Sequence, residues 1–174
     1  GVNELCHTPV SGDLMLTNYQ NYQNIRNGIT VEYNENGKKT SNILRLLSYN
    51  DVLSNTFTVA SQMWIKGETH WRWPDLVIFI NGFSLVFIEL KNSNIPVKNA
   101  YDINLKNYLK DIPYLFNYNQ ICVLSNGMET RLGSFAAGYE FFFEWLKVEN
   151  EKENPDRKAI RESCTSLEYF IAGL

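Results

Sequence analysis

Three charged residues stand out because they interrupt two apolar stretches of the chain. Asp75 precedes the run Leu76–Ile80, and Glu89 and Lys91 end the run that begins at Phe83. A carboxylate from each of two neighbouring strands would supply oxygen ligands for Mg²⁺, which usually keeps several waters and takes substrate phosphate as a further ligand. A nearby ammonium group could orient a water or offset charge that grows on that phosphate. We therefore interpret the three residues as a candidate phosphodiester-cleaving site.

The spacing of Glu89 and Lys91 sharpens this interpretation and also supplies its main alternative. Residues two apart on a strand point to the same face, and the peptide carbonyl of Leu90 between them could add a third metal ligand. A Glu-x-Lys pair alone would usually be a solvated salt bridge worth ~0–1 kcal/mol. The metal site is favoured because Pro74 and Asp75 begin the partner strand, and Asp75 lies fourteen residues before Glu89.

The two apolar runs are predicted to form a hairpin, because Asn81-Gly82 is a strong signal for a two-residue turn. Such a turn makes paired residue numbers sum to 163, so Asp75 would face Ile88 and Glu89 would point to the other side of the sheet. A shared metal needs both carboxylates on one side. We therefore predict a three-residue connection with Gly82 or a neighbour in a bulge, or else a bulge near Asp75, either of which shifts the register by one residue.

The remaining elements are predicted from apolar periodicity and turn residues. Both hairpin strands are apolar on both faces, so we expect them in the centre of a sheet that is covered on each side. The expected helices are 13–26, 97–109, 139–148 and 157–172, and the expected further strands are a hairpin around 31–33, then 43–47, 57–65 and 121–124. The order predicts an α/β fold with a mixed central sheet flanked by helices.

Composition limits the possible classes of protein. The chain has 174 residues, 44% of them hydrophobic, which suits one folded domain with a sizeable core. Its net charge of −3 gives no electrostatic argument for nucleic acid and does not exclude it, because phosphate contacts need only a local patch. Three separated cysteines and two histidines give no pattern for a disulfide framework or zinc site. No apolar run is long enough to span a bilayer, so we expect a cytoplasmic protein with no membrane partner.

The site residues lie in longer segments that resemble a known family. Residues 72–82 (RWPDLVIFING) and 85–92 (LVFIELKN) are similar to the Arg-Pro-Asp and Glu-Leu-Lys strands of the N-terminal nuclease domain in the restriction (R) subunit of type I restriction-modification enzymes. This domain belongs to the PD-(D/E)xK nuclease superfamily. Segments 55–62, 111–119 and 125–134 resemble the flanking parts of the same domain, so the resemblance covers residues from about 28 to 145.

The resemblance implies a restriction-endonuclease-like core that cleaves double-stranded DNA with Mg²⁺. Asp75 and Glu89 would bind the metal, and Lys91 would assist the attacking water. The family also has a Gln-x-x-x-Tyr motif on the next helix. Tyr108 matches its tyrosine, whereas Asn104 is one methylene shorter than its glutamine.

Further positions matter less to the resemblance. Gln62 is a possible accessory residue at the end of the preceding strand. Trp73 stands where the family often has a second arginine, and Asn126 stands where it often has an aspartate. Neither departure touches the three central residues.

The resemblance also implies partners. The family's R subunit continues into ATP-driven motor domains and assembles with modification and specificity subunits, and we expect this chain to be a nuclease domain cut from such a protein. The segment 146–174 would be a helical extension. No P-loop pattern occurs in the chain, so ATP would serve only the motor domains.

Alternatives remain within the family and outside it. The domain could be a catalytically inactive docking or DNA-holding module, or a standalone nuclease of the same superfamily. Four basic residues could form a DNA-contacting rim beside the site, although solvated helix charges are the more common explanation for such residues: Arg72, Lys98, Lys106 and Lys110.

Overall fold

The centre of the protein is a mixed six-stranded sheet. The computed structural model describes residues 12–144, and the strand order within them is β10-β9-β8-β7-β6-β3. Strands β7 and β8 run parallel, and the other neighbouring pairs are antiparallel. The strands are β3 (Phe57–Ser61), β6 (Leu76–Ile80), β7 (Phe83–Leu90), β8 (Ile121–Ser125), β9 (Thr130–Gly133) and β10 (Phe143–Glu144). The α/β class and the mixed sheet predicted from the sequence are confirmed.

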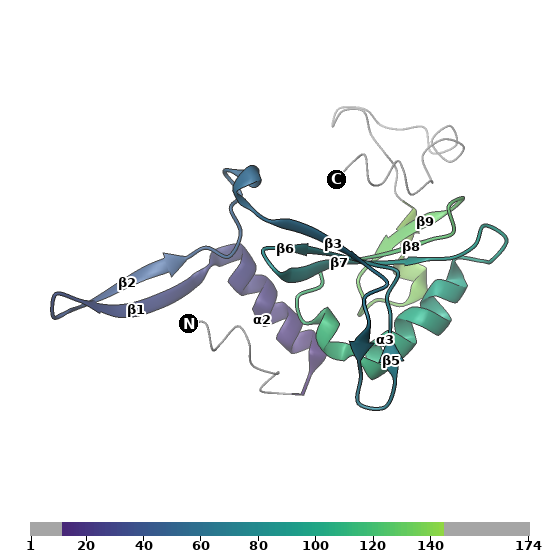
Figure 1. Ribbon diagram of the computed structural model, residues 1–174, viewed down its shortest axis with the longest axis horizontal. Helices are drawn as coiled ribbons and strands as arrows, with labels where there is room; N and C mark the ends of the chain where they lie inside the picture. Colours follow the sequence, from purple (N-terminus) through teal and green to yellow (C-terminus); the bar gives the residue numbers. More distant parts are fainter. Residues whose placement is uncertain (1–11, 145–174) are drawn as a thin grey trace.

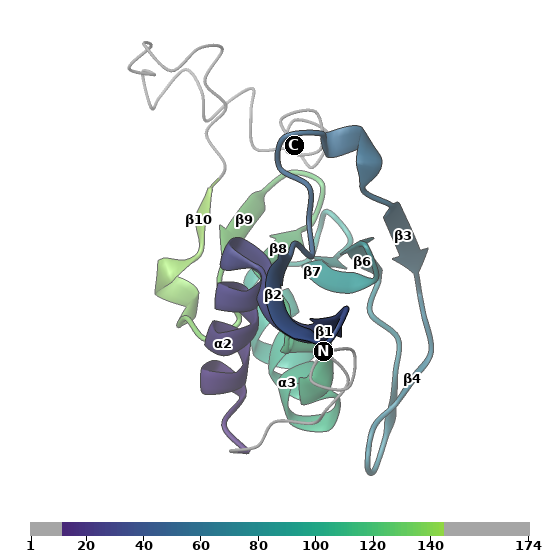
Figure 2. The same cartoon turned by 90° about the vertical axis from the view of Figure 1, so that its left-hand side faces the viewer.

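The two longest described helices, α2 (Leu14–Asn27) and the one that contains α3 (Lys106–Asp111), lie on one face of this sheet, as Figures 1 and 2 show. Helix α2 crosses beneath the sheet, and the second helix joins a π-helical segment, η2 (Ala100–Leu105), to α3. The short 3-10 segments are η1 (Val52–Ser54), η3 (Pro113–Phe116) and η4 (Tyr139–Phe141). None of the helices found within residues 12–144 is long and apolar enough to cross a membrane.

Two hairpins stand apart from the central sheet. Strands β1 (Ile29–Glu35) and β2 (Lys38–Leu44) form an arm that extends away from the body (Figure 1). Strands β4 (Ile65–Lys66) and β5 (Trp71–Arg72) form a short hairpin between β3 and β6. Because β4–β5 leads directly into β6, it lies next to the beginning of the predicted site.

Local sequence signals account for the main boundaries. Asp13 caps helix α2 by accepting hydrogen bonds from the backbone of Met15 and Leu16, at 2.8 and 3.3 Å. Gly28 ends the helix with a φ of +83°, a conformation that glycine adopts without steric cost. Asn81 and Gly82 both have positive φ, +50° and +85°, as a type I′ turn between twisted strands requires.

The main core lies between the sheet and the η2–α3 helix. Phe87 and Leu124 from the sheet pack in one cluster with Leu105 and Tyr108 from the helix. A second cluster joins Leu85 of β7 to α2 and the segment after the arm, and a third lies around Ile88 and Val123 on the other face. The hairpin strands are therefore central in the sheet, as predicted from their apolar character.

Three predicted elements differ from those observed. The strand predicted for 57–65 ends at Ser61, because Gln62 has a φ of +46° and leaves the extended conformation. Only the first two residues of the strand predicted for 43–47 are in a strand, at the end of β2. The helix predicted for 139–148 is wrong over residues 139–144, which form η4 and then β10.

The reason for the last error is a contact distant in sequence. Phe142 is fully buried, and its ring covers Gly133, where an added Cβ would lie 2.7 Å from the ring. Arg131 also donates to the Phe142 carbonyl at 3.0 Å. These contacts hold the segment along the sheet edge as β10. Residues 145–148, and the helix predicted for 157–172, lie outside the described residues.

Candidate active site

The β6–β7 hairpin contains the register shift that the sequence predicted. Next to the turn, Ile80 pairs with Phe83 and Phe79 with Ser84, but Ile78 then pairs with Val86. Leu85 is therefore the extra residue of a β-bulge. The turn keeps its two residues, and the bulge restores the parity. The bulge lies in the middle of the hairpin rather than at Gly82 or near Asp75, so the predicted shift is present but its predicted position was wrong.

The shifted register brings two carboxylates together. Leu76 pairs with Ile88, so the next residues outward, Asp75 and Glu89, stand opposite each other and share a face of the sheet. Asp75 accepts a hydrogen bond from the backbone of Leu90 at 2.8 Å, which fixes one of its carboxylate oxygens. The N–H and C=O of one strand residue point to the same side, so the Leu90 carbonyl also points toward Asp75.

Glu89 is the most unusual charged residue of the site, because its side chain is only 2% exposed. The pKa of its carboxyl is raised to about 7, because the effect of burial outweighs the hydrogen bond from Lys91 that lowers it, and the nearby charge of Asp75 acts in the same direction as burial. Its Oε2 is buried and has no hydrogen-bond partner within the described residues. A buried carboxylate oxygen without a partner is costly, so this atom marks a place where a cation would be stabilising.

Lys91 supplies the positive charge of the site. Its Nζ donates to Glu89 Oε1 at 2.8 Å, and its side chain is 18% exposed. An ammonium has three donors, and Glu89 accepts one of them. Lys91 can therefore hold the Glu89 carboxylate and still present hydrogens to an atom that approaches from solvent.

Tyr108 and Asn104 complete the site from the helix. The Tyr108 hydroxyl donates to the Trp73 carbonyl at 3.4 Å. The pKa of Tyr108 is raised to about 12, because burial and the charge of Glu89 together outweigh a hydrogen bond with Asn104 that lowers it. A cleft of about 130 Å³ between the helix and the β5–β6 junction is lined by both residues, together with Arg72, Trp73, Ile103 and Asn107.

Arg72 and Asp111 form an ion pair that the sequence did not indicate. Arg72 Nε donates to Asp111 Oδ2 at 2.7 Å, and its Nη2 contacts the same oxygen. The Asp111 side chain is only 3% exposed, and the Arg72 guanidinium holds the pKa of that carboxyl below its usual value. The pair ties β5 to the end of α3, so in this structure Arg72 is engaged by the protein itself. No local pattern could have revealed it, since the partners are 39 residues apart.

The other three residues of the predicted basic rim lie along the same helix. Lys98 and Lys106 both form ion pairs with Asp102, and the Lys106 pair measures 2.9 Å. Lys110 is exposed in the last turn of α3. The rim residues are therefore near one another, but two of the three ammonium groups have an acidic partner.

Residues 2–141 match the model of the family described as type I restriction enzyme R protein N terminus. The chain belongs to this family.

Two relatives within this R-protein N-terminal family can be aligned with most of the chain. One is a putative type I restriction enzyme endonuclease subunit, MjaIXP, of Methanocaldococcus jannaschii, which is 36% identical over 168 residues and matches 88% of this chain. Another is the type I restriction enzyme HindI endonuclease subunit of Haemophilus influenzae, 34% identical over 162 residues and 90% of this chain. The matched parts are 16% and 15% of the lengths of these relatives.

Gln62 contributes to the site of this R-protein domain through its backbone. Its N–H donates to the carbonyl of Asp75 at 2.9 Å, and its left-handed conformation turns the chain from β3 toward β4. Non-glycine residues are uncommon in that conformation. Gln62 therefore fixes the main chain at Asp75. Its side chain is exposed and makes no hydrogen bond to Asp75 or Glu89 within residues 12–144.

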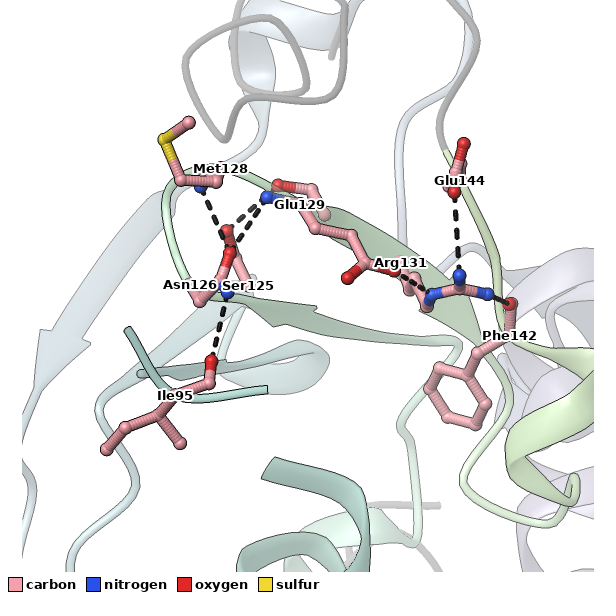
Figure 3. A network of polar contacts seen from close by, with 9 residues as sticks. Ile95, Ser125, Asn126, Met128, Glu129, Arg131, Phe142 and Glu144 are labelled. Carbon is pink, nitrogen blue, oxygen red and sulfur yellow. Dashed lines mark hydrogen bonds and ion pairs between the residues drawn. The ribbon is translucent and has the colours of Figure 1, made fainter. Parts of the chain in front are cut away.

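Asn126 anchors the segment that leaves Lys91, as Figure 3 shows. Its amide donates to the Ile95 carbonyl at 3.0 Å, and its side-chain carbonyl accepts from the backbone of Met128 and Glu129. An aspartate could make the second set of contacts but could not donate to Ile95. The asparagine at this position therefore ties the loop after β7 to the β8–β9 turn, near the end of Lys91's strand.

Proposed function

We propose that this chain is a Mg²⁺-dependent nuclease domain that hydrolyses DNA phosphodiester bonds for a type I restriction enzyme. The observation that carries the proposal is the bulge at Leu85, because it puts Asp75 opposite Glu89 at the point where Lys91 binds Glu89. A purely structural salt bridge between Glu89 and Lys91 would not need Asp75 and Glu89 on the same face of the sheet. The arrangement supports a nuclease of the PD-(D/E)xK type.

The residues of the site fit a hard cation. Asp75 and the buried Glu89 Oε2 would hold Mg²⁺, and the Leu90 carbonyl would be a third ligand. The described residues contain no group of three or more His, Cys, Asp or Glu side chains around a common point, and Mg²⁺ commonly uses one or two carboxylates with waters and phosphate. When bound, the ion would offset the negative charge of the scissile phosphate and lower the pKa of a water.

The protein's own groups then have separate tasks. Lys91 favours the charged form of Glu89, and its remaining donors would orient the attacking water or the phosphate oxygens. Tyr108, which interacts with Glu89, and Asn104 line the cleft between the helix and the β5–β6 junction and would limit the positions that a phosphate can take. In the hydrolysis, the water oxygen attacks phosphorus and gives up one proton, the bond from phosphorus to the leaving sugar oxygen breaks, and that oxygen takes up a proton from solvent.

The context of the domain follows from its relatives and is part of the same proposal. The chain spans about a sixth of the curated endonuclease subunits that it matches. We infer that it acts within a longer R polypeptide whose motor domains use ATP. Double-stranded DNA would be its substrate, and modification and specificity subunits would be its partners.

Cleavage by the assembled enzyme tests the proposal. A complex that carries Asp75→Ala should bind DNA normally but linearise a plasmid at least about 10²-fold more slowly, because one metal ligand is lost. Asp51→Ala, which changes an exposed acidic residue in the β2–β3 connection, is the matched control and should cleave at the wild-type rate. Wild-type cleavage by the Asp75→Ala complex would contradict the proposal.

A further inference from the structure

The short β4–β5 hairpin has two faces of very different character. Its register pairs Ile65 with Arg72 and Lys66 with Trp71. The first pair faces the protein, since Ile65 is buried in the main core and Arg72 binds Asp111. The second pair must face outward, because successive strand residues point to opposite sides.

The outward face is built from large aromatic rings. Trp64 and Trp73 alternate with the inward pair and join Trp71 on the outer side, and we call these three residues the tryptophan platform. Their exposed fractions are 68% for Trp64, 51% for Trp71 and 47% for Trp73. The Trp64 ring centre lies 4.9 Å from that of Trp73 and 6.2 Å from that of Trp71. The outer face of a hairpin is normally polar, and a contiguous exposed apolar patch marks a binding surface.

The platform is held firmly rather than presented on a loose loop. Tyr114 donates its hydroxyl to the carbonyl of Lys66 at 2.8 Å. At Gly67 the hairpin approaches the helix so closely that an added Cβ would lie 2.4 Å from the Asp111 carbonyl oxygen. With the Arg72–Asp111 pair, these contacts fix the hairpin to the end of α3 at several points.

The platform also adjoins the candidate active site. Trp73 lies two residues before Asp75, and its carbonyl accepts the hydrogen bond from Tyr108. The cleft beside Tyr108 and Asn104 has Trp73 in its wall. A polymer that passes through this cleft toward Asp75 would therefore meet the platform.

Lys66 adds a cation to the same face. It stands opposite Trp71, and it has no ion pair within residues 12–144. Aromatic rings that stack on bases, together with cations that follow the phosphates, are the combination that binds single-stranded nucleic acid. Stacked base pairs present only their edges to such a surface, whereas an unpaired base can offer its whole ring.

We propose that the tryptophan platform and Lys66 bind unpaired nucleobases, and the phosphates between them, in the DNA strand that enters the Asp75–Glu89–Lys91 site. This proposal rests on the proposed nuclease function, which it extends by naming the form of DNA held beside the site. The platform would stack on one or two bases, and Lys66 would contact an adjacent phosphate.

Binding by the 174-residue chain tests the proposal when metal is chelated, so that cleavage plays no part. The probes are a fluorescent 12-nucleotide single strand and a blunt duplex of the same sequence. The double variant Trp64→Ala/Trp71→Ala should bind the single strand at least about tenfold more weakly, because the bases can no longer stack on these two rings. Its affinity for the blunt duplex should change much less.

Two control variants separate stacking from other causes. Trp64→Phe/Trp71→Phe keeps aromatic faces and should retain most of the single-strand affinity. Phe57→Ala removes another exposed aromatic ring, 53% exposed on β3, and should bind like the wild type. Thermal unfolding of each variant shows that the fold is retained.

Salt dependence tests the role of Lys66. Loss of one phosphate contact should reduce the slope of log affinity against log salt by about 0.7 for a single strand. Lys66→Gln should show this change, and the double tryptophan variant should keep the wild-type slope. An unchanged slope for Lys66→Gln would remove Lys66 from the proposed surface.

The wild-type chain gives a measurement that needs no variant. The platform contains three of the four tryptophans of the chain, so saturable quenching of intrinsic fluorescence by the single strand is expected. Absence of quenching, or equal binding by wild type and the double alanine variant, would overturn the proposal. A change of oligomeric state in that variant with unchanged DNA binding would instead identify a protein interface. Neither result would affect the Asp75→Ala cleavage test, so the two proposals fail separately.

Discussion

The chemistry of the site depends on one buried carboxylate and its neighbours. Glu89 lies on the face of the sheet that covers the core. One of its carboxylate oxygens accepts a hydrogen bond from Lys91, and the other has no hydrogen-bond partner in the described residues. An ionised carboxylate in such a place needs a compensating charge. Lys91 compensates part of it, and the acidic neighbour Asp75 makes a second cation favourable.

Divalent metal binding by the chain is the prediction that follows. Mn²⁺ should bind somewhat more tightly than Mg²⁺, in line with the usual preference of oxygen and nitrogen ligands. Titration calorimetry should show Mn²⁺ binding that Asp75→Asn and Glu89→Gln each remove. Asp102→Asn is the control, because this exposed helix carboxylate already pairs with two lysines. Equal binding by all four proteins would mean that the two carboxylates are structural.

The Arg72–Asp111 pair predicts a pH dependence of stability. The hydrogen bond from Arg72 lowers the pKa of Asp111 in the folded state, so the Asp111 carboxylate binds a proton less readily in the folded protein than in the unfolded chain. The pair therefore contributes stability above the unfolded pKa of about 3.9, and that contribution is lost as the pH falls through the lower folded pKa. Denaturant unfolding should show Asp111→Asn less stable than wild type at pH 7, with a smaller difference at pH 3. A difference that grows toward acid pH would contradict this assignment.

At the level of elements, the β-bulge decides what the hairpin can do. The bulge residue Leu85 packs with Ile25 of α2 and with Leu46 and Leu47. This cluster holds the extra residue on the side of α2, while β7 beyond it returns to regular pairing with β6. The register of β7, and with it the position of Glu89, therefore depends on the packing of Leu85 against segments that are distant in sequence.

Two changes at Leu85 should separate register from packing. Leu85→Ala keeps the extra residue, so it should lower the free energy of unfolding by roughly 2–4 kcal/mol but preserve metal binding. Deletion of Leu85 removes the bulge and would turn Glu89 away from Asp75. Folded deletion protein, identified by its circular dichroism and unfolding transition, should not bind Mn²⁺ in calorimetry. Normal metal binding by that protein would mean that the register does not place the carboxylates.

The sequence predicted the parts of the fold that depend on local signals. The hairpin strands, the Asn81-Gly82 turn and the need for a register shift follow from apolar runs, turn chemistry and parity. The position of the bulge does not, because it depends on how Leu85 meets other segments. The Arg72–Asp111 pair and the strand at 143–144 were missed for the same reason: partners far along the chain decide them.

On the scale of the whole molecule, the candidate site would act within the longer R polypeptide proposed above. The described residues place the site, the tryptophan platform and the η2–α3 helix side by side, while the β1–β2 arm extends from the opposite end (Figure 1). Delivery of DNA to such a site would depend on the motor domains and partner subunits proposed above. Activity of the assembled complex is therefore the relevant measurement, and it must separate cleavage from transport.

Lys91→Ala in the complex makes that separation. The variant removes the ammonium group but leaves both carboxylates, so Mn²⁺ should still bind, although more weakly where protonation of Glu89 competes. DNA binding and ATP hydrolysis should remain, because no P-loop pattern occurs in this chain. Plasmid linearisation should fall about 10²–10³-fold, the usual effect of losing one electrostatic contact to a transition state.

Lys98→Ala, which removes a surface lysine of the helix, controls for a general loss of positive charge. Wild-type cleavage by the Lys91→Ala complex would reject the role assigned to this lysine, and joint loss of ATPase and cleavage would instead support a docking module.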